Sequence, residues 1–374
     1  MKVRSVPRFL VIPLLVSAVA DARAIEQRSS SNGTVGNRPP VCQDFIIPVH
    51  AQKTIEGTVS LEDYDIDVLF SVSDGEVLVD GDYELSARFC EPPAGIASKD
   101  TLQVLLHGAT FNKVMWDFPY KPEEYSWVLY MTNAGYSTLA IDFVGAGNST
   151  KPNGYLEVQT ATLVQNTHEV LQGIRSEGVL GRTFDQVALV GFSIGGVVAN
   201  AIAATYPTDV DNILFLGTSW DKDWVYPAFI AGLQTAGNIL NPDKWGNLDN
   251  FYQTQPTVAA REVACFFGNY DAEALQTDFE TRDLDTLGAA LSFAFHLSEA
   301  PEFRGPVFLG IGRQDSSFCP KVCGSQPYAI YDSFPAASNH VVRVYDNTGH
   351  ALLYHHVAPQ VIRDARLYLD QHSA

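Results

Sequence analysis

Basic side chains are scarce in this sequence. Its 374 residues include 24 lysines and arginines against 43 aspartates and glutamates, which gives a formal net charge of −19. Nucleic acids and anionic membrane surfaces are bound through clustered positive charge. The acidic balance therefore argues against either of them as a partner, although it says little about the fold.

Long hydrophobic runs are also lacking. The main candidate, residues 9–20, contains Pro13 and is short of the roughly 20 apolar residues that a membrane-spanning helix needs. Basic residues before it and small residues after it are typical of a secretory signal peptide. We expect residues 1–24 to be removed by cleavage after Ala24, with a cut after Ala20 or an uncleaved anchor as alternatives. The sequence thus predicts a secreted, extracellular protein with no membrane span after cleavage.

Cysteines are few, and none has the spacing of a two-cysteine, two-histidine metal site. We therefore predict no metal site. In an oxidising compartment four of the five cysteines are expected to pair. Cys42 and Cys90 flank the first β-rich segment, and Cys319 and Cys323 would close a small loop. Cys265 lies in an apolar context and is expected to be a buried free thiol.

Two sequons are possible acceptors for N-glycans. Asn32 lies in a segment rich in serine, asparagine, glycine, arginine and proline, residues 25–40, which we expect to be a disordered leader. Asn148 follows a predicted strand, where the acceptor could be too enclosed for use. Both sites remain hypotheses at this stage.

The pattern of predicted elements changes near residue 100. Before it, alternating β-rich runs at 45–49, 67–72 and 83–89 predict antiparallel strands. After it, strands are predicted at 102–106, 136–142, 187–190, 213–216, 307–311 and 341–345, and helices at 125–134, 159–177 and 358–371. Strands that alternate with helices indicate an α/β fold, with a mostly parallel central sheet and helices on both faces. The ligand site of such a sheet lies at the carboxyl ends of its strands.

About ninety residues separate the strands that end near 216 and begin near 307, far more than an ordinary connection needs. We interpret residues 219–304 as a helical lid inserted into a core made of residues 41–218 and 305–374. The insertion is rich in aromatic residues. Most of these should form its own core, and a few should line an apolar substrate pocket.

The stretch around Ser193 organises the chain. An apolar run at 187–190 predicts a buried strand, and small residues up to the proline at 207 predict a helix. Between them Gly191, Ser193 and Gly195 fit Gly-x-Ser-x-Gly. Glycines two residues on either side relieve crowding at a tight strand-to-helix turn that exposes the serine hydroxyl. The pattern predicts a nucleophilic serine; the alternative is a serine needed only for packing.

A nucleophilic serine needs a base and an acid that orients the base. His350 follows the last strand on a glycine-containing loop and is the predicted base, whereas we expect His355 to be a surface or helix-start residue. Asp315 follows the strand at 307–311 and is the predicted acid, with Asp221 as the alternative, which could instead cap a helix. The backbone amides of Ala109 and Ile194 are the predicted donors to an oxyanion, and His107 is expected to shape the loop that carries Ala109.

Several short motifs together resemble those of lid-bearing α/β-hydrolases, of the branch related to fungal secreted hydrolases. The matching segments are His107-Gly108-Ala109-Thr110, Trp116-Asp117-Phe118-Pro119, Ala134-Gly135-Tyr136, Ile141-Asp142, Gly145-Ala146-Gly147-Asn148-Ser149, the serine turn, Gly312-Arg313-Gln314-Asp315 and Gly349-His350. The resemblance covers residues 42–372 and implies a Ser–Asp–His triad, no cofactor and acyl transfer to water. Residues 143–145 depart from it, because relatives usually have arginine or a similar polar residue after the aspartate. This departure affects the loop and not the triad.

The sequence favours a secreted serine hydrolase that cleaves a carboxylic ester or lactone of an apolar, bulky small molecule. Three alternatives stay open. The triad could serve natural-product biosynthesis by cyclisation, elimination or acyl transfer. An aminopeptidase-like hydrolase would need carboxylates such as Glu262 or Glu273 in the pocket. A non-catalytic binding protein could also use this scaffold. The oligomeric state is not predicted.

Overall fold

An eight-stranded sheet runs through the described part of the chain, which a computed structural model gives as residues 37–58, 75–176, 178–221, 225–319 and 322–372. The strand order is β1-β2-β4-β3-β5-β6-β10-β11. These residues all belong to one structural unit, Gly36–Ala374. The predicted signal peptide, the acceptor Asn32 and the predicted strand at 67–72 lie outside the described residues.

Six strands form the parallel part of the sheet. They are β3 (Thr101–Leu106), β4 (Ser137–Ile141), β5 (Gln186–Phe192), β6 (Asn212–Leu216), β10 (Val307–Gly312) and β11 (His340–Tyr345). Each lies within two residues of a strand that the sequence predicts. The α/β class and the mostly parallel sheet are confirmed.

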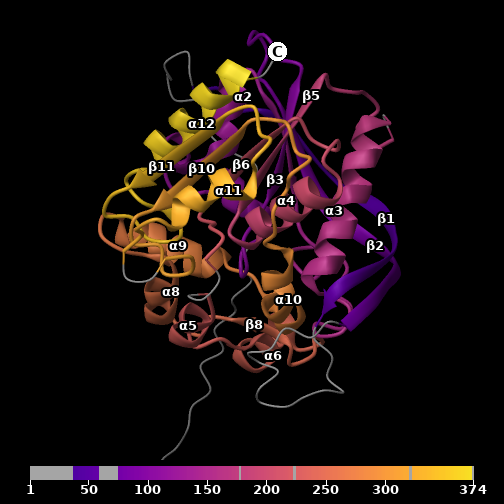
Figure 1. Cartoon of the computed structure of the whole chain (residues 1–374). Coiled ribbons are helices and arrows are strands. Elements are labelled where there is room, and N and C mark those ends of the chain that lie inside the picture. The colour runs from indigo at the N-terminus through magenta and orange to yellow at the C-terminus, as the bar shows by residue number, and fades with distance from the viewer. Residues whose placement is uncertain (1–36, 59–74, 177, 222–224, 320–321, 373–374) are drawn as a thin grey trace, which may run out of the picture. The chain divides into compact units, whose positions relative to one another are not determined.

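Both faces of the sheet are buried, and β5 shows why its sequence is a continuous apolar run. Val187 and Leu189 pack into one hydrophobic cluster, while Ala188 and Val190 pack into the cluster on the opposite face. Helices α3 (Thr160–Arg175) and α4 (Ile194–Thr205) cover the first face, and α2 (Trp127–Asn133) and α12 (Ala358–His372) cover the second (Figure 1). Because successive strand residues point to opposite faces, a polar side chain anywhere from 187 to 190 would be buried.

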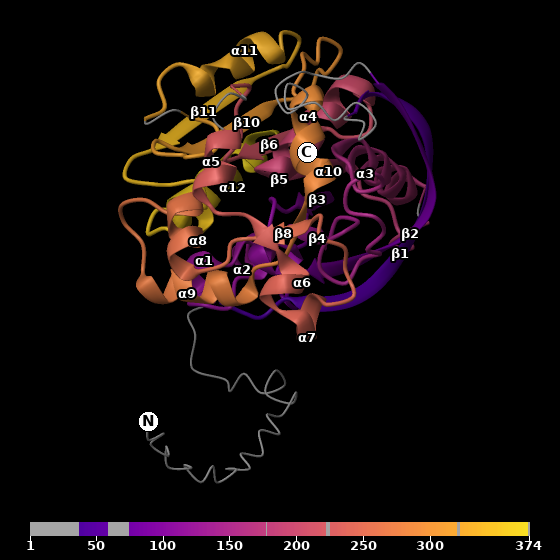
Figure 2. The same cartoon turned by 90° about the horizontal axis from the view of Figure 1, so that it is seen from below.

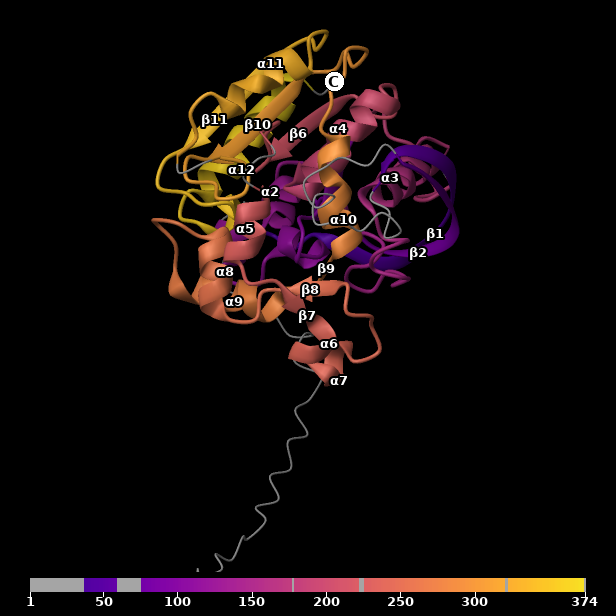
Figure 3. The same ribbon diagram turned by 60° about the horizontal axis from the view of Figure 1, so that its bottom comes forward.

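Two long antiparallel strands extend the sheet at one edge. β1 (Val41–Thr58) pairs with β2 (Gly75–Glu91), and β2 pairs antiparallel with β4. They curve past α3 as a ribbon (Figure 3). The leader ends earlier than the sequence suggests. Arg38 donates from its guanidinium to the Ala94 carbonyl, and its backbone N–H donates to the Asn133 side chain.

The insertion between β6 and β10 lies across one end of the sheet (Figure 2). Its helices are α5 (Val225–Ala231), α6 (Gly237–Leu240), α7 (Pro242–Trp245), α8 (Val258–Cys265), α9 (Ala272–Thr281), α10 (Leu287–Ser292) and the 3-10 turn η4 (Phe293–His296). It also contains a small sheet that the sequence analysis missed, with the order β7-β8-β9. These strands, β7 (Thr235–Ala236), β8 (Tyr252–Thr254) and β9 (Asp285–Thr286), are too short for a periodic pattern.

The remaining elements are short turns of helix around the core. They are η3 (Lys113–Asp117), α1 (Pro122–Tyr125), η5 (Gln326–Ala329), α11 (Ile330–Ser333) and η6 (Leu352–Tyr354). Among the helices of the described ranges, none has the length and apolar character that crossing a bilayer requires.

The strand order creates a crevice at the carboxyl end of the sheet. From β3 the chain moves to β4 on one side, and β5 then pairs with β3 on its other side. Loops that leave β3 and β5 therefore diverge at a topological switch point, where ligands bind in open α/β sheets. The loop after β3 carries His107 to Asn112, and the turn after β5 carries Ser193.

Candidate active site

The turn at Ser193 has the strained backbone that the sequence predicts. Ser193 has φ 55° and ψ −119°, a backbone conformation that residues other than glycine rarely adopt. A Cβ at Gly191 would lie 2.2 Å from the Gly195 carbonyl oxygen, and a Cβ at Gly195 would lie 2.3 Å from the Leu106 carbonyl oxygen. Only glycine fits at both positions, so the motif follows from the packing of the turn between β3 and α4.

Ser193, His350 and Asp315 form a chain of hydrogen bonds. The Ser193 Oγ lies 2.9 Å from His350 Nε2, and His350 Nδ1 lies 2.8 Å from Asp315 Oδ2. Since the carboxylate can only accept, Nδ1 carries the imidazole proton and Nε2 accepts from the serine hydroxyl. All three side chains are buried. Residues from three strand ends, separated by up to 157 positions in the sequence, thus come into direct contact.

Of the two acids that the sequence offers, the structure places Asp315 against His350. Its second oxygen, Oδ1, accepts from the backbone amides of Ser317 and Phe318 at 2.9 and 3.0 Å. Asp221 lies beyond the end of β6, and its backbone N–H contacts the Ser219 hydroxyl. The Asp315 carboxylate is therefore fixed by the chain around it, with one oxygen left for the imidazole.

Two backbone amides face the same space as the serine. Ala109 and Ile194 both line the pocket that contains Ser193 and His350. Among the residues that the structure describes, neither amide N–H has a hydrogen-bond acceptor. Unpaired buried donors are uncommon in proteins, and Ile194 is also the first residue of α4, where the helix dipole favours negative charge. This pair of donors suits a negatively charged oxygen.

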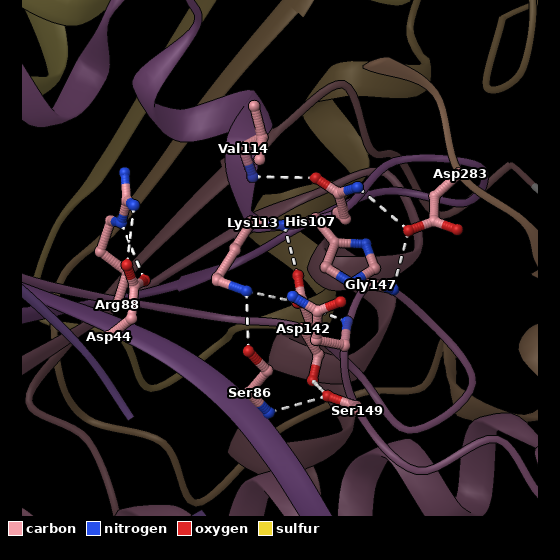
Figure 4. A network of polar contacts seen from close by, with 12 residues as sticks. Asp44, Ser86, Arg88, His107, Lys113, Val114, Asp142, Gly147, Ser149 and Asp283 are labelled. Atoms are coloured by element: carbon pink, nitrogen blue, oxygen red, sulfur yellow. Dashed lines mark hydrogen bonds and ion pairs between the residues drawn. The ribbon is translucent and has the colours of Figure 1, made fainter. Parts of the chain in front are cut away.

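The loop that carries Ala109 is held by a polar network on the side of β4 (Figure 4). His107 bonds the Gly108 carbonyl through Nδ1, and its Nε2 accepts from the Phe143 N–H at 3.0 Å. Burial lowers the pKa of His107, which keeps the ring neutral. Lys113 donates from its backbone N–H and its ammonium to the two oxygens of Asp142, at 2.7 and 2.6 Å. His107 thus has the loop-shaping position that we predicted.

The pocket beside Ser193 is lined mostly by apolar residues. Its wall includes Phe111 and Phe318 from the core and Phe293 from the insertion. Cys265, the free cysteine, also lines it, and burial raises the pKa of its thiol to about 12. The thiol is therefore protonated at neutral pH and unlike a reactive cysteine.

The prediction for His355 is wrong, and an alternative function loses its support. His355 is fully buried rather than on the surface. Its Nδ1 contacts the Ala351 carbonyl, and its Nε2 accepts from the backbone amides of Phe267 and Gly349. Glu262 and Glu273 are exposed and do not belong to the pocket wall, so they offer no support for an aminopeptidase-like site. Of these partners only Phe267 is distant in the sequence, 88 positions away, and a local pattern gives no signal for that contact.

The remaining site predictions concern the cysteines and Asn148. The structure bonds Cys42 to Cys90 and Cys319 to Cys323. Asn148 is exposed, and the hydroxyl of its sequon partner Thr150 accepts from the Glu84 N–H at 2.8 Å. Within the described ranges, no group of three or more histidine, cysteine, aspartate or glutamate side chains is arranged to hold a metal ion.

A serine, a histidine and an acid at the carboxyl edge of a doubly covered parallel sheet define the class of α/β hydrolases. Sequence comparison agrees, because the profile described as "Alpha/beta hydrolase family" matches residues 103–365. The chain belongs to this family.

The proteins that this chain resembles include an esterase in sequence and a lipase in fold. A pimeloyl-[acyl-carrier protein] methyl ester esterase of Pseudoalteromonas atlantica is 25% identical over 68% of this chain and 88% of its own. A soluble variant of the Saccharomyces cerevisiae monoglyceride lipase, solved with a substrate analogue, superposes with a TM-score of 0.54 at 13% identity, over 86% of this chain and 97% of its own. An α/β hydrolase fold protein from Chitinophaga pinensis has a TM-score of 0.51 at 14% identity, over 86% and 98%. At such identities the two structures support the fold alone.

Proposed function

We propose that this protein is a serine hydrolase of carboxylic esters or lactones, and that the hydrogen-bond chain from Ser193 through His350 to Asp315 is its catalytic triad. That chain, at the edge of an apolar pocket with two unpaired amides, is the observation that carries the proposal. The similarity to a methyl ester esterase of Pseudoalteromonas atlantica agrees with it.

The geometry supports a two-step acyl transfer. Ser193 attacks the ester carbonyl while His350 Nε2 takes its proton and then gives that proton to the leaving alcohol. Asp315 holds the imidazole in the required tautomer and stabilises it when it is charged. The Ala109 and Ile194 amides bind the oxyanion of each tetrahedral intermediate. Water then attacks the acyl-enzyme while His350 takes its proton. His350 finally returns this proton to Ser193, and the carboxylic acid leaves.

The pocket supports a neutral, apolar substrate of small-molecule size. Its walls in the described ranges come mainly from apolar side chains, and its polar groups are few: the hydroxyls of Thr110, Ser193 and Ser317, the amides of Gln234 and Gln255, and His350. A charged acyl or alcohol group would lose its hydration there without gaining a partner. The insertion supplies part of the wall and acts as a lid in this proposal.

We also propose that the protein is secreted. The two disulfides support this, because such bonds persist in oxidising compartments. N-glycans at Asn32 and Asn148 belong to the same proposal. Purification from the culture medium of a secreting host, followed by N-terminal sequencing and intact mass, tests it; a chain that begins at Met1 would contradict the signal peptide.

Replacement of the serine tests the catalytic proposal. We expect Ser193→Ala to remove hydrolysis of p-nitrophenyl esters, leaving at most about 10³–10⁴-fold acceleration over water from the oxyanion donors and binding. Initial rates over a series of acyl chain lengths and lactones measure this. Ser176→Ala, an exposed position at the end of α3, is the matched control and should retain full activity. Unchanged turnover in Ser193→Ala would refute the proposal.

A further inference from the structure

The insertion contains an arginine with no exposed surface. Arg261, on α8, has a side-chain exposure of 0%. Its Nε and Nη2 donate to the two carboxylate oxygens of Asp278 at 2.7 and 2.8 Å. Its Nη1 donates to the Gln255 side-chain oxygen at 2.9 Å and to the Thr110 hydroxyl at 2.5 Å. One rigid guanidinium thus connects two parts of the insertion to the loop that carries Ala109.

Thr110 needs such a connection, because its backbone is strained. Its φ is 64°, in the left-handed region that β-branched residues avoid. Such a conformation persists only when its surroundings hold it. Three contacts do so: the Thr110 hydroxyl donates to the Ala109 carbonyl, it accepts from Arg261, and the Thr110 carbonyl accepts from the Asp283 N–H at 2.9 Å. Two of the three come from the insertion.

The strained residue lies next to a proposed oxyanion donor. The Thr110 hydroxyl bonds the Ala109 carbonyl, which lies on the peptide after the Ala109 Cα, whereas the donor N–H lies on the peptide before it. Because the two peptides share this Cα, we expect the contacts of Thr110 to influence the orientation of the donor N–H. Phe111 adds to this restraint, because the Arg261 guanidinium lies over its ring at 4.1 Å from the centroid. On the far side of the loop, Asp283 accepts from Asn112 and from the Gly147 N–H (Figure 4).

Stability alone gives little reason for this buried ion pair. Burying two charges is costly, and well-packed apolar residues often serve as well. A lysine in place of Arg261 could pair with Asp278, but a single ammonium cannot reproduce the planar fork that meets Asp278, Gln255 and Thr110 together. The feature that requires arginine is therefore the third contact, to the loop.

We propose that Arg261 is a positioning residue: it holds Thr110, and through it the Ala109 amide, in the orientation that binds the oxyanion. The inference rests on the proposed function, since it assigns Arg261 a role in the same reaction. Arg261 touches no reacting atom. Its helix also contributes Ala264 and Cys265 to the pocket wall, so α8 joins the wall and the oxyanion loop in one element.

Three variants test this role in the full-length protein. Arg261→Lys keeps the charge and loses the fork. Thr110→Val keeps the shape of the side chain and removes the hydroxyl that Arg261 bonds. Arg282→Lys is the matched control, because Arg282 is a half-buried arginine of the insertion that bonds the Gln255 and Phe279 carbonyls and does not line the pocket.

We expect Arg261→Lys and Thr110→Val each to lower kcat for a p-nitrophenyl ester by about 10- to 100-fold. Displacement of a catalytic group by about 1 Å can lower the rate by about 100-fold. KM should change less than threefold, since the amide acts on the transition state. The double variant should be no slower than the slower single variant, because both changes break one contact. Arg282→Lys should retain the kcat of the wild type. Thermal unfolding of each variant shows whether it is folded.

Other outcomes would overturn the inference. A wild-type kcat in folded Thr110→Val, equal losses in Arg261→Lys and Arg282→Lys, or an effect on KM alone would each assign Arg261 a structural role. If Arg261→Lys does not fold, Thr110→Val decides the question. Ser193→Ala separates the two proposals: Ser193-dependent turnover with no effect of Thr110→Val defeats only this inference, whereas turnover that survives Ser193→Ala defeats the proposed function and this inference together.

Discussion

At Asp315, one carboxylate has two different tasks. One oxygen is held by two backbone amides and the other meets the imidazole of His350. An asparagine would keep the shape, but its amide nitrogen cannot accept from His350 Nδ1–H, and its orientation would compete with the two backbone donors.

We therefore expect Asp315→Asn to lower kcat by a factor of the order of 10⁴, as loss of the correct tautomer does in other triads. Asp221→Asn, at the acid that the structure leaves away from His350, is the control and should keep its rate. Steady-state kinetics of both variants measures the difference. Equal losses in the two variants would contradict the assignment.

His355 gives the protein a sensitivity to acid. Burial lowers its pKa to about 4, and its Nε2 must stay unprotonated to accept from two amides. In the unfolded chain this histidine has an ordinary pKa near 6.5. Between about pH 6.5 and 4 the unfolded chain therefore binds a proton that the folded chain does not bind. The contribution of His355 to the free energy of unfolding is therefore complete above about pH 6.5. It is lost as the pH falls through 4, and the loss is at most about 3 kcal/mol.

Chemical unfolding at several pH values tests this effect. His296 acts in the same direction, since burial lowers its pKa to about 4 too. Asp285 opposes both, because burial raises its pKa to about 7 and its stabilising protonated form is lost as pH rises. We expect the free energy of unfolding of His355→Gln to depend less steeply on pH between 6.5 and 4 than that of the wild type, while His50→Gln, at an exposed histidine of β1, keeps the wild-type slope. Equal slopes in all three proteins would refute the account.

The sequence could predict the positions of residues that lie in or beside a local pattern. Ser193 lies in a five-residue motif, and His350 and Asp315 follow predicted strands, so the sequence could bring them to one edge. Arg261 and Thr110 have no such pattern, because they are separated by 151 positions and meet through a positive φ and a buried ion pair. Both of those features are visible only in three dimensions.

Among the elements, the sequence predicts those whose hydrophobic pattern extends over many residues and those with a continuous apolar run. The six parallel strands and helices α3 and α12 fall where hydrophobic patterns place them. The two- and three-residue strands of the insertion were missed, since they are fixed by their packing. Tyr252 on β8, for example, is buried with Trp245 and Leu284 and donates its hydroxyl to the Pro152 carbonyl.

The two disulfides belong to elements of different kinds, and we expect different effects from their removal. Cys42 and Cys90 are paired residues of β1 and β2 and are 48 positions apart, whereas Cys319 and Cys323 are four positions apart. By loop-closure entropy, the first bond restricts the unfolded chain by about 4 kcal/mol and the second by about 2 kcal/mol. Cys42→Ser with Cys90→Ser should therefore lower the Tm more than Cys319→Ser with Cys323→Ser. Differential scanning calorimetry compares the two; the reverse order would contradict this argument.

At the scale of the whole molecule, the sheet and the insertion contribute different parts of the site. The carboxyl ends of β5, β10 and β11 lead to the three residues of the proposed triad, and the loop after β3 brings Ala109 beside Ser193. The insertion closes the pocket with apolar walls and contacts the same loop through Arg261 and Asp283. The net charge of −19 leaves the proposed neutral substrates unaffected, and it disfavours association with anionic surfaces.

Labelling with a fluorophosphonate tests the central claim most directly, because the probe needs an activated serine and an oxyanion site together. Peptide mass spectrometry of the labelled, folded protein should find one phosphonate on Ser193, and it should find none in Ser193→Ala or in protein unfolded before labelling. An unlabelled Ser193 in folded protein, or a label on another residue that survives Ser193→Ala, would contradict the account.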